Sequence, residues 1–235
     1  MKKFRVKQKL KAFMATALCV CMAASPLTAF AESLPEQEES ILSDNFDELV
    51  RRAEEENKEH EAEQIALNSA DEGLVVKTYA SGNYDFNVDL TVGKTINYNG
   101  YQTHQYSLSD GTVVYCLEPS KANPSNGQYT ASVSNDALFS AVAYYGYGGP
   151  GYESDKGMYN MLQENVRPYA YVITHMALSW VYDGCSDDSD AFKGNAATAD
   201  GIKNMVNLIN AYSWTVPSDF AAFTFGTSGQ TMGFG

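Results

Sequence analysis

The fold is decided by residues 85–117, which begin Asp85-Phe86-Asn87-Val88-Asp89-Leu90-Thr91-Val92. Polar and apolar residues alternate along this stretch, as is typical of a β-strand with one buried face. The pair Asn99-Gly100 then predicts a tight hairpin turn. Two further strand-like runs follow at 105–108 and 112–117, separated by a turn at 109–111. The front half of this region is therefore predicted to be rich in strands.

The middle of the chain changes to helical spacing of its apolar residues. We predict helices over 137–145, 169–181 and 202–209, of which the first is stopped by glycines and a proline at 146–150. Residues 223–225 and 232–234 predict two closing strands. Strands, then helices, then strands within about 160 residues predict a single α+β domain over 74–235.

The first 31 residues predict a secretory signal peptide. Six basic residues precede a 13-residue apolar run, Ala12 to Ala24, and the small residues Ala29 and Ala31 frame a cleavage site. The apolar run is shorter than the roughly 20 residues that a membrane-spanning helix needs. We therefore expect the mature protein to be secreted.

The segment 32–73 differs sharply from the rest in composition. It carries fifteen acidic residues against three basic ones, which predicts a solvated spacer or pro-segment with little structure. Leu42, Phe46 and Leu49 nevertheless fall at helical spacing, so a short amphipathic helix over 43–63 is compatible with the sequence. A helix that docks on a partner is the alternative interpretation of this segment.

The charge balance excludes one class of partner. The chain has 16 basic and 29 acidic residues, a net charge of −13, and six of the basic residues lie in the signal peptide. An acidic body repels phosphate backbones, so we expect no nucleic-acid partner.

Cys116 is the first candidate for chemistry, because it ends a predicted strand and is not followed by a helix. Thiol-protease nucleophiles normally gain a low pKa from a helix N-terminus and an adjacent imidazole. His175, with Asp183 or Asp187 as an orienting carboxylate, allows such a triad without requiring one. Two other interpretations stay open: an unreactive buried cysteine, or a disulfide between Cys116 and Cys185.

Three sequence blocks bear on this choice: Tyr115-Cys116-Leu117, Thr174-His175-Met176-Ala177-Leu178-Ser179-Trp180 and Gly229-Gln230-Thr231-Met232. In this order they resemble the motifs of the thioester domain of Gram-positive surface adhesins. The middle block is the most specific, and in that family it reads Thr-Gln-x-Ala. His175 replaces the glutamine here, which is similar to clostridial surface-anchored proteins that carry isopeptide-bonded stalk repeats.

The resemblance implies a specific chemistry. Cys116 and Gln230 would condense with loss of ammonia into an internal thioester, with His175 as an assisting group and the rings of Tyr115, Tyr145, Tyr147 and Trp180 available to wall in the bond. Amines on host proteins, mainly lysine side chains, would displace the thiol and become covalently attached. Such a domain acts once without turnover, so we expect an adhesin and not an enzyme, with no cofactor and no metal. The alternative is a secreted thiol hydrolase or transglutaminase-like enzyme that uses Cys116, His175 and an aspartate.

The resemblance also implies a setting for the domain. We expect a cell-wall-associated monomer at the N-terminal end of a longer parent chain with stalk domains, because no stalk or sorting signal follows Gln230. Four aspartates crowd the loop after the second long helix, but they lack the spacing of a calcium loop. We interpret this loop, which contains Asp183, Asp187, Asp188 and Asp190, as a solvated acidic surface.

Overall fold

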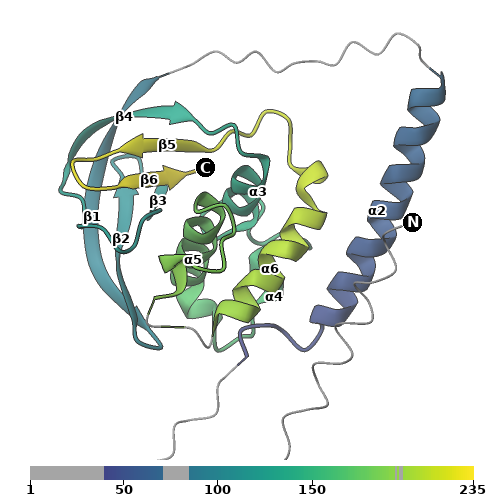
Figure 1. Cartoon of the computed structure of the whole chain (residues 1–235), viewed down its shortest axis with the longest axis horizontal. Helices are drawn as coiled ribbons and strands as arrows, with labels where there is room; N and C mark the ends of the chain where they lie inside the picture. The colour runs from purple at the N-terminus through teal and green to yellow at the C-terminus, as the bar shows by residue number, and fades with distance from the viewer. Residues whose placement is uncertain (1–39, 71–84, 194, 196–197) are drawn as a thin grey trace, which may run out of the picture. The chain divides into compact units, whose positions relative to one another are not determined.

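The computed structural model describes residues 40–70, 85–193, 195 and 198–235 (Figure 1). The predicted signal peptide and the predicted domain boundary near residue 74 lie outside these ranges. Within them, no helix is long and apolar enough to cross a membrane.

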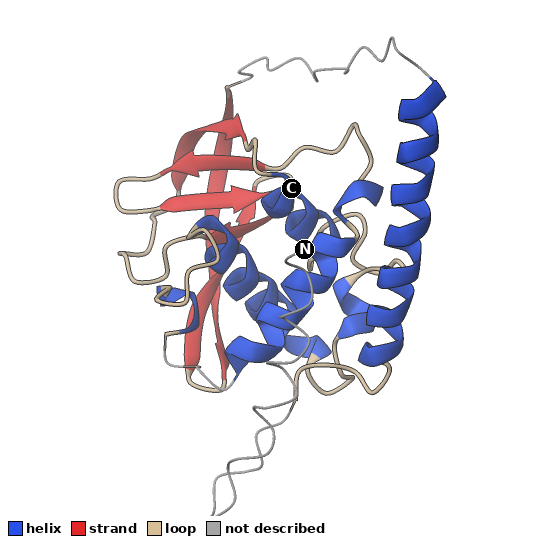
Figure 2. Cartoon of the chain, turned by 45° about the vertical axis from the view of Figure 1, so that its right-hand side comes forward, coloured by secondary structure: helices blue, strands red, loops and turns tan. Residues whose placement is uncertain are grey.

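Six antiparallel strands form a closed barrel, drawn red in Figure 2. Its strand order is β1-β2-β3-β6-β5-β4. Alternate residues point inward and form a small core of their own, as the alternation in the sequence predicts. The strands are β1 (Phe86–Tyr98), β2 (Tyr101–Leu108), β3 (Val113–Cys116), β4 (Gly127–Val133), β5 (Phe223–Gly226) and β6 (Thr231–Phe234).

The predicted turns and closing strands are confirmed. Asn99 and Gly100 join β1 to β2 with φ angles of 44° and 81°, the left-handed conformation that a tight hairpin needs. Strands β5 and β6 pair with each other, and they close the barrel against β4 and β3 respectively.

Strand β3 changes its partner strand along its length, and this change determines where Cys116 lies. Val113 and Val114 pair with β2, whereas Tyr115 and Cys116 pair with β6. The part of β2 before Tyr106 therefore has no β3 partner. Cys116 lies at the end of β3 where the strand has left β2 and joined β6.

Helices cover one side of the barrel (Figure 1). The three predicted helices are confirmed, and the fold class is α+β as predicted. α5 contacts β3 and is buried at every residue from Ala170 to Val181, because it lies between the barrel and the other helices. The elements are α3 (Ala137–Tyr145), α4 (Met158–Met161), η1 (Arg167–Tyr169), α5 (Ala170–Tyr182), η2 (Asp190–Phe192), α6 (Ala199–Ala211) and η4 (Ser213–Thr215).

The acidic segment contains a longer helix than predicted, α2 (Phe46–Ala70), which contacts α6. Leu49 and Ala53 are buried in the core, and Tyr212 donates a hydrogen bond to the carbonyl of Leu49 at 3.0 Å. The expectation of little structure is therefore wrong for this helix. Composition averaged over the whole segment hides a narrow apolar stripe that is sufficient to dock one helical face.

Candidate functional site

Cys116 and Gln230 meet at one end of the β3–β6 pair. Cys116 lies opposite Met232 in the strand register, so Gln230, two residues earlier, falls just beyond the end of β3. The Sγ atom of Cys116 hydrogen-bonds to Oε1 of Gln230, and both residues are only 4% exposed. The structure thus brings together the two residues that the sequence blocks single out.

The carboxamide of Gln230 is held in one orientation. Its Nε2 donates a hydrogen bond to the carbonyl of Ala122 at 2.7 Å, which only the nitrogen side of the amide is able to do. The backbone of Gln230 is fixed by Thr227, whose N–H and hydroxyl donate to the Gln230 carbonyl at 2.8 and 2.9 Å. The carbonyl oxygen therefore faces the thiol, and the nitrogen faces Ala122.

Residues 117–126, here called the covering loop, fold over this contact. Leu117 N–H donates to Thr231 O at 2.9 Å, and Glu118 Oε2 accepts from Thr231 N–H at 2.8 Å. Lys121 forms an ion pair with Glu118 at 2.5 Å. These bonds, together with that from Gln230 to Ala122, tie the covering loop to β6 and shield the Cys116–Gln230 contact from water.

The side chain of Cys116 lies in the barrel core, and not among the aromatic rings that were expected to surround it. It clusters with Tyr106, Val114 and Met232 among others. Tyr115 points to the opposite face of β3 from Cys116, because side chains alternate along a strand. It lies in the other core cluster together with Tyr145 of α3 and Trp180 of α5, and Tyr147 packs against that cluster. Ser179 of α5 reaches the site from that side and donates a hydrogen bond to Cys116 O at 2.9 Å.

Burial raises the pKa of the Cys116 thiol to about 11. The charge of Glu118 acts in the same direction, and the hydrogen bonds of Cys116 with the Glu118 backbone and with Gln230 oppose the rise only in part. The thiol is therefore neutral at physiological pH, unlike the low-pKa thiolates of thiol hydrolases.

His175 lies in the middle of α5 and is 1% exposed. Burial alone lowers its pKa to about 3, so the imidazole is neutral. Its Nδ1 lies 3.4 Å from Thr103 Oγ1, and its Nε2 has no hydrogen-bond partner among the described residues. Among the described residues, His175 forms no hydrogen bond with Cys116 or with a carboxylate.

The other residues of the proposed triad and disulfide also lie apart. Asp187 forms an ion pair with Lys203 at 2.8 Å, and Asp183 follows the last residue of α5 at the surface. Cys116 and Cys185 are both free thiols. The structure therefore assembles neither a Cys-His-Asp triad nor a Cys116–Cys185 disulfide.

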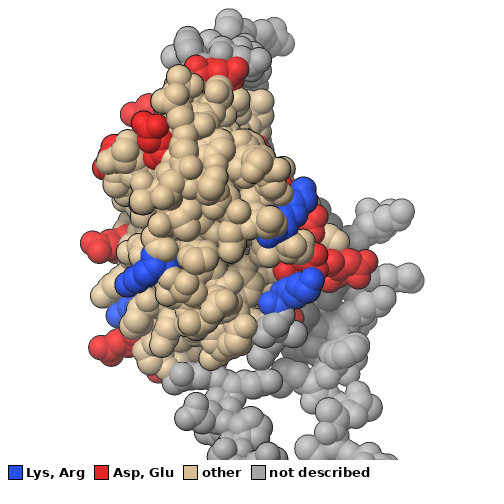
Figure 3. Space-filling model, turned by 90° about the vertical axis from the view of Figure 1, so that its left-hand side faces the viewer, with Lys and Arg blue, Asp and Glu red and all other residues tan. Residues whose placement is uncertain are grey.

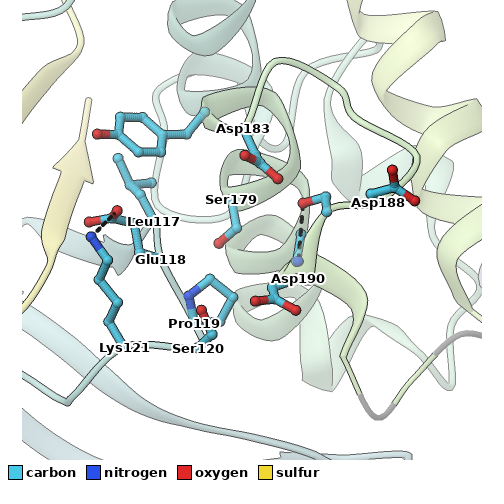
Figure 4. Close-up of a pocket in the computed structure, with 12 residues that line it drawn as sticks. Leu117, Glu118, Pro119, Ser120, Lys121, Ser179, Asp183, Asp188 and Asp190 are labelled. Atoms are coloured by element: carbon cyan, nitrogen blue, oxygen red, sulfur yellow. Dashed lines mark hydrogen bonds and ion pairs between the residues drawn. The ribbon is translucent and has the colours of Figure 1, made fainter.

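A cleft of about 230 Å³ lies between the start of the covering loop and the end of α5, and neither Cys116 nor Gln230 is among its lining residues (Figure 4). Leu117 and Ser179, both next to Cys116, form part of its wall. Figure 4 shows Glu118 and Lys121 on one side of Ser179, and three aspartates around the rest of the cleft: Asp183, Asp188 and Asp190. Among the described residues no cluster of side chains is suited to hold a metal ion.

The negative charge is unevenly distributed over the surface. Figure 3 shows that the outward face of the barrel side is mostly free of charged side chains. Acidic residues concentrate instead on α2 and around the cleft. Electrostatic attraction of a cation is therefore local to these regions.

The sequence analysis missed several residues that shape the site. Ser179 lies within the block 174–180 but has no predicted role, and Glu118 is not predicted to take part in the site. Ala122 contributes a backbone carbonyl, for which the sequence carries no signal.

A comparison with known protein families gives one match. A family model described as "Thioester domain" matches residues 87–216, more than half of the chain, including Cys116 and His175 but ending before Gln230. Among solved structures, the thioester domain of the Enterococcus faecium TIE86 protein is similar, with 16% sequence identity, 61% of each chain covered and a TM-score of 0.35. A comparison with curated proteins finds no match.

Proposed function

The chain belongs to the thioester domain family, and on this premise we propose that Cys116 and Gln230 form an internal thioester for covalent attachment to amines. The observation that carries the proposal is the buried hydrogen bond between Cys116 Sγ and Gln230 Oε1. It places the nucleophilic sulfur beside the carboxamide carbon that it would attack.

The condensation needs only these two side chains. Sulfur attacks Cδ of Gln230, the Cδ–N bond breaks, and the thiol proton leaves with the nitrogen as ammonia. An amine then attacks the same carbon, the C–S bond breaks, and an amine proton returns to Cys116. The products are an amide on Gln230 and a free thiol.

Burial gives the stored bond its lifetime. A thioester hydrolyses in water, so it persists only where water is excluded. The covering loop, tied to β6 through the hydrogen bonds of Leu117 and Glu118 to Thr231, supplies that exclusion after the nitrogen has left.

The cleft supplies a route for a cationic amine. Its carboxylates attract an ammonium group, and its wall includes Leu117 and Ser179, both next to Cys116. We therefore propose lysine side chains of host proteins as the targets. The domain then acts once per molecule as a cell-surface adhesin module of a Gram-positive organism, monomeric and carried on stalk domains of a longer chain.

Capture of a small amine tests this function. The purified chain incubated with methylamine should gain one adduct, located on Gln230 by peptide mapping, and should gain no second adduct with time. Gln230→Glu should abolish capture, whereas the matched variant Gln163→Glu should retain it. If capture persists in Gln230→Glu and disappears in Gln163→Glu, then Gln163, and not Gln230, forms the thioester.

A further inference from the structure

The nitrogen of the Gln230 side chain lies on the side of the covering loop. The carbonyl oxygen of that side chain faces the thiol of Cys116 in the barrel core, whereas Nε2 donates to the carbonyl of Ala122 at 2.7 Å. Ala122 and its neighbours Lys121 and Asn123 are exposed. Of the two atoms that the reaction separates, sulfur therefore lies against the core, and nitrogen lies against an exposed loop.

The carbonyl of Ala122 is held by contacts that do not involve Gln230. Asn123, the next residue, accepts a hydrogen bond from the hydroxyl of Tyr106, which is 1% exposed in the barrel core, at 3.2 Å. A Cβ atom added to Gly229 would lie 3.4 Å from Ala122 O and 3.5 Å from Ala122 Cβ, so Ala122 leaves room there for little more than a methyl group. Neither contact is lost when the amide nitrogen leaves as ammonia.

The Gln230 carboxamide shows where a captured amine places its nitrogen. The amide that capture would form is the same carboxamide with one substituent on nitrogen. Its nitrogen therefore takes the position of Nε2, where one N–H group donates to Ala122 O. Formation and capture exchange nitrogen and sulfur on one carbon in opposite directions, so the amine arrives where ammonia departs.

We propose that the carbonyl of Ala122 is the nitrogen subsite of this exchange and that it selects nucleophiles with two hydrogens on the attacking atom. The inference rests on the proposed thioester. The nitrogen lone pair forms the bond to Cδ of Gln230, and the C–S bond breaks with its electron pair on sulfur. One amine hydrogen passes as a proton to Cys116 Sγ, and the other stays on nitrogen and donates to Ala122 O.

This requirement defines the substrate class as primary amines. An uncharged primary amine supplies one hydrogen for sulfur and one for Ala122 O. A secondary amine or an alcohol has a single hydrogen, which passes to sulfur, so its product has no donor for the carbonyl and one hydrogen bond is lost. Asn123 and Tyr106 are then positioning residues, because they act on the amine through the Ala122 carbonyl.

Two isomeric amines test the subsite in the full chain. Ethylamine and dimethylamine have the same atoms and similar basicity, but the first has two hydrogens on nitrogen and the second has one. The ratio of their capture rates should exceed the ratio measured with a small alkyl thioester in solution by roughly 10- to 10²-fold. Azetidine, a secondary amine whose ring holds its carbons back, should be disfavoured to the same extent as dimethylamine.

Asn123→Ala tests the support of the carbonyl, because it removes the acceptor of the Tyr106 hydrogen bond. The ratio of ethylamine to dimethylamine capture should fall roughly tenfold, toward that of the free thioester. Asn123→Asp keeps an acceptor oxygen and should retain the wild-type ratio. The matched control is Asn126→Ala, which removes another bond between the covering loop and the barrel, from Val92 N–H at 2.6 Å, and should also retain that ratio.

The contrary results separate the parts of the proposal. A ratio equal to that of the free thioester overturns the nitrogen subsite and leaves the thioester in place. Azetidine capture as fast as that of ethylamine, each relative to the free thioester, also overturns it, because selection would then follow crowding. An unchanged ratio in Asn123→Ala overturns the positioning role of Asn123 and Tyr106. A wild-type chain that retains its ammonia overturns the proposed function and this inference together.

Discussion

The Sγ atom of Cys116 hydrogen-bonds to Oε1 of Gln230 across 114 positions of sequence. The contact exists because β3 leaves β2 after Val114 and pairs with β6, which brings the ends of the domain together. The barrel therefore does the positioning that a condensation needs, and it holds both groups away from water.

Acid should release the covering loop. Burial acts to raise the pKa of Glu118, but hydrogen bonds from Lys121 and Thr231 outweigh it and hold the pKa below the usual 4.5. A lowered pKa in the folded state means that the ionised carboxylate stabilises the fold. This contribution is complete above pH 4.5 and is lost as the pH falls through the folded pKa.

Thioester hydrolysis reports this release. At pH 7 the variant Glu118→Ala should hydrolyse roughly tenfold faster than the wild type, because the covering loop has lost its tie to β6. The ratio of the two rates should approach one as Glu118 of the wild type becomes protonated. A ratio of hydrolysis rates that does not change with pH would show that Glu118 does not hold the covering loop closed. Glu153→Ala, at an exposed position, is the control and should hydrolyse at the wild-type rate.

The carboxylates of the cleft should speed the capture of cationic amines. The double variant Asp183→Asn/Asp190→Asn should capture a lysine-rich peptide roughly tenfold more slowly at low salt, and added salt should narrow the difference. Capture of hydroxylamine, which is neutral at pH 7.5, should be unchanged. An equal loss for both nucleophiles would indicate damage to the site and not electrostatic steering.

Helix α2 should contribute to the stability of the domain. Leu49 is 4% exposed in the core, so Leu49→Ala should lower the free energy of unfolding by about 2–4 kcal/mol. The matched variant Glu59→Ala, on the exposed face of α2, should change it by about 0.5 kcal/mol or less. Chemical denaturation measures both, and equal small effects would mean that α2 is dispensable.

Much of the secondary structure is predictable from local pattern. Strict alternation over 85–92, the Asn99-Gly100 turn and the apolar spacing of α5 each dictate one local structure. Strand β4 escapes prediction because most of its side chains remain exposed and only Ala131 is fully buried. Because the barrel closes through β4, its closure is not predictable from the local sequence either.

The site was predictable only in part. Cys116 and Gln230 were chosen by resemblance to a family, and only the fold explains why they meet. The resemblance implies that His175 assists the reaction. Its distance from the reacting atoms is set by which face of β3 is covered by α5, and this is a property of the fold. The contact of Ala122 with Gln230 depends on the path of the covering loop, which no local pattern encodes.

The intact mass of the purified chain tests the internal thioester most directly. The wild type and Cys185→Ala should each weigh one ammonia less than their sequences require, whereas Cys116→Ala and Gln230→Glu should have their full masses. A wild-type chain of full mass, or one that lacks only the two hydrogens of a disulfide, would contradict the thioester.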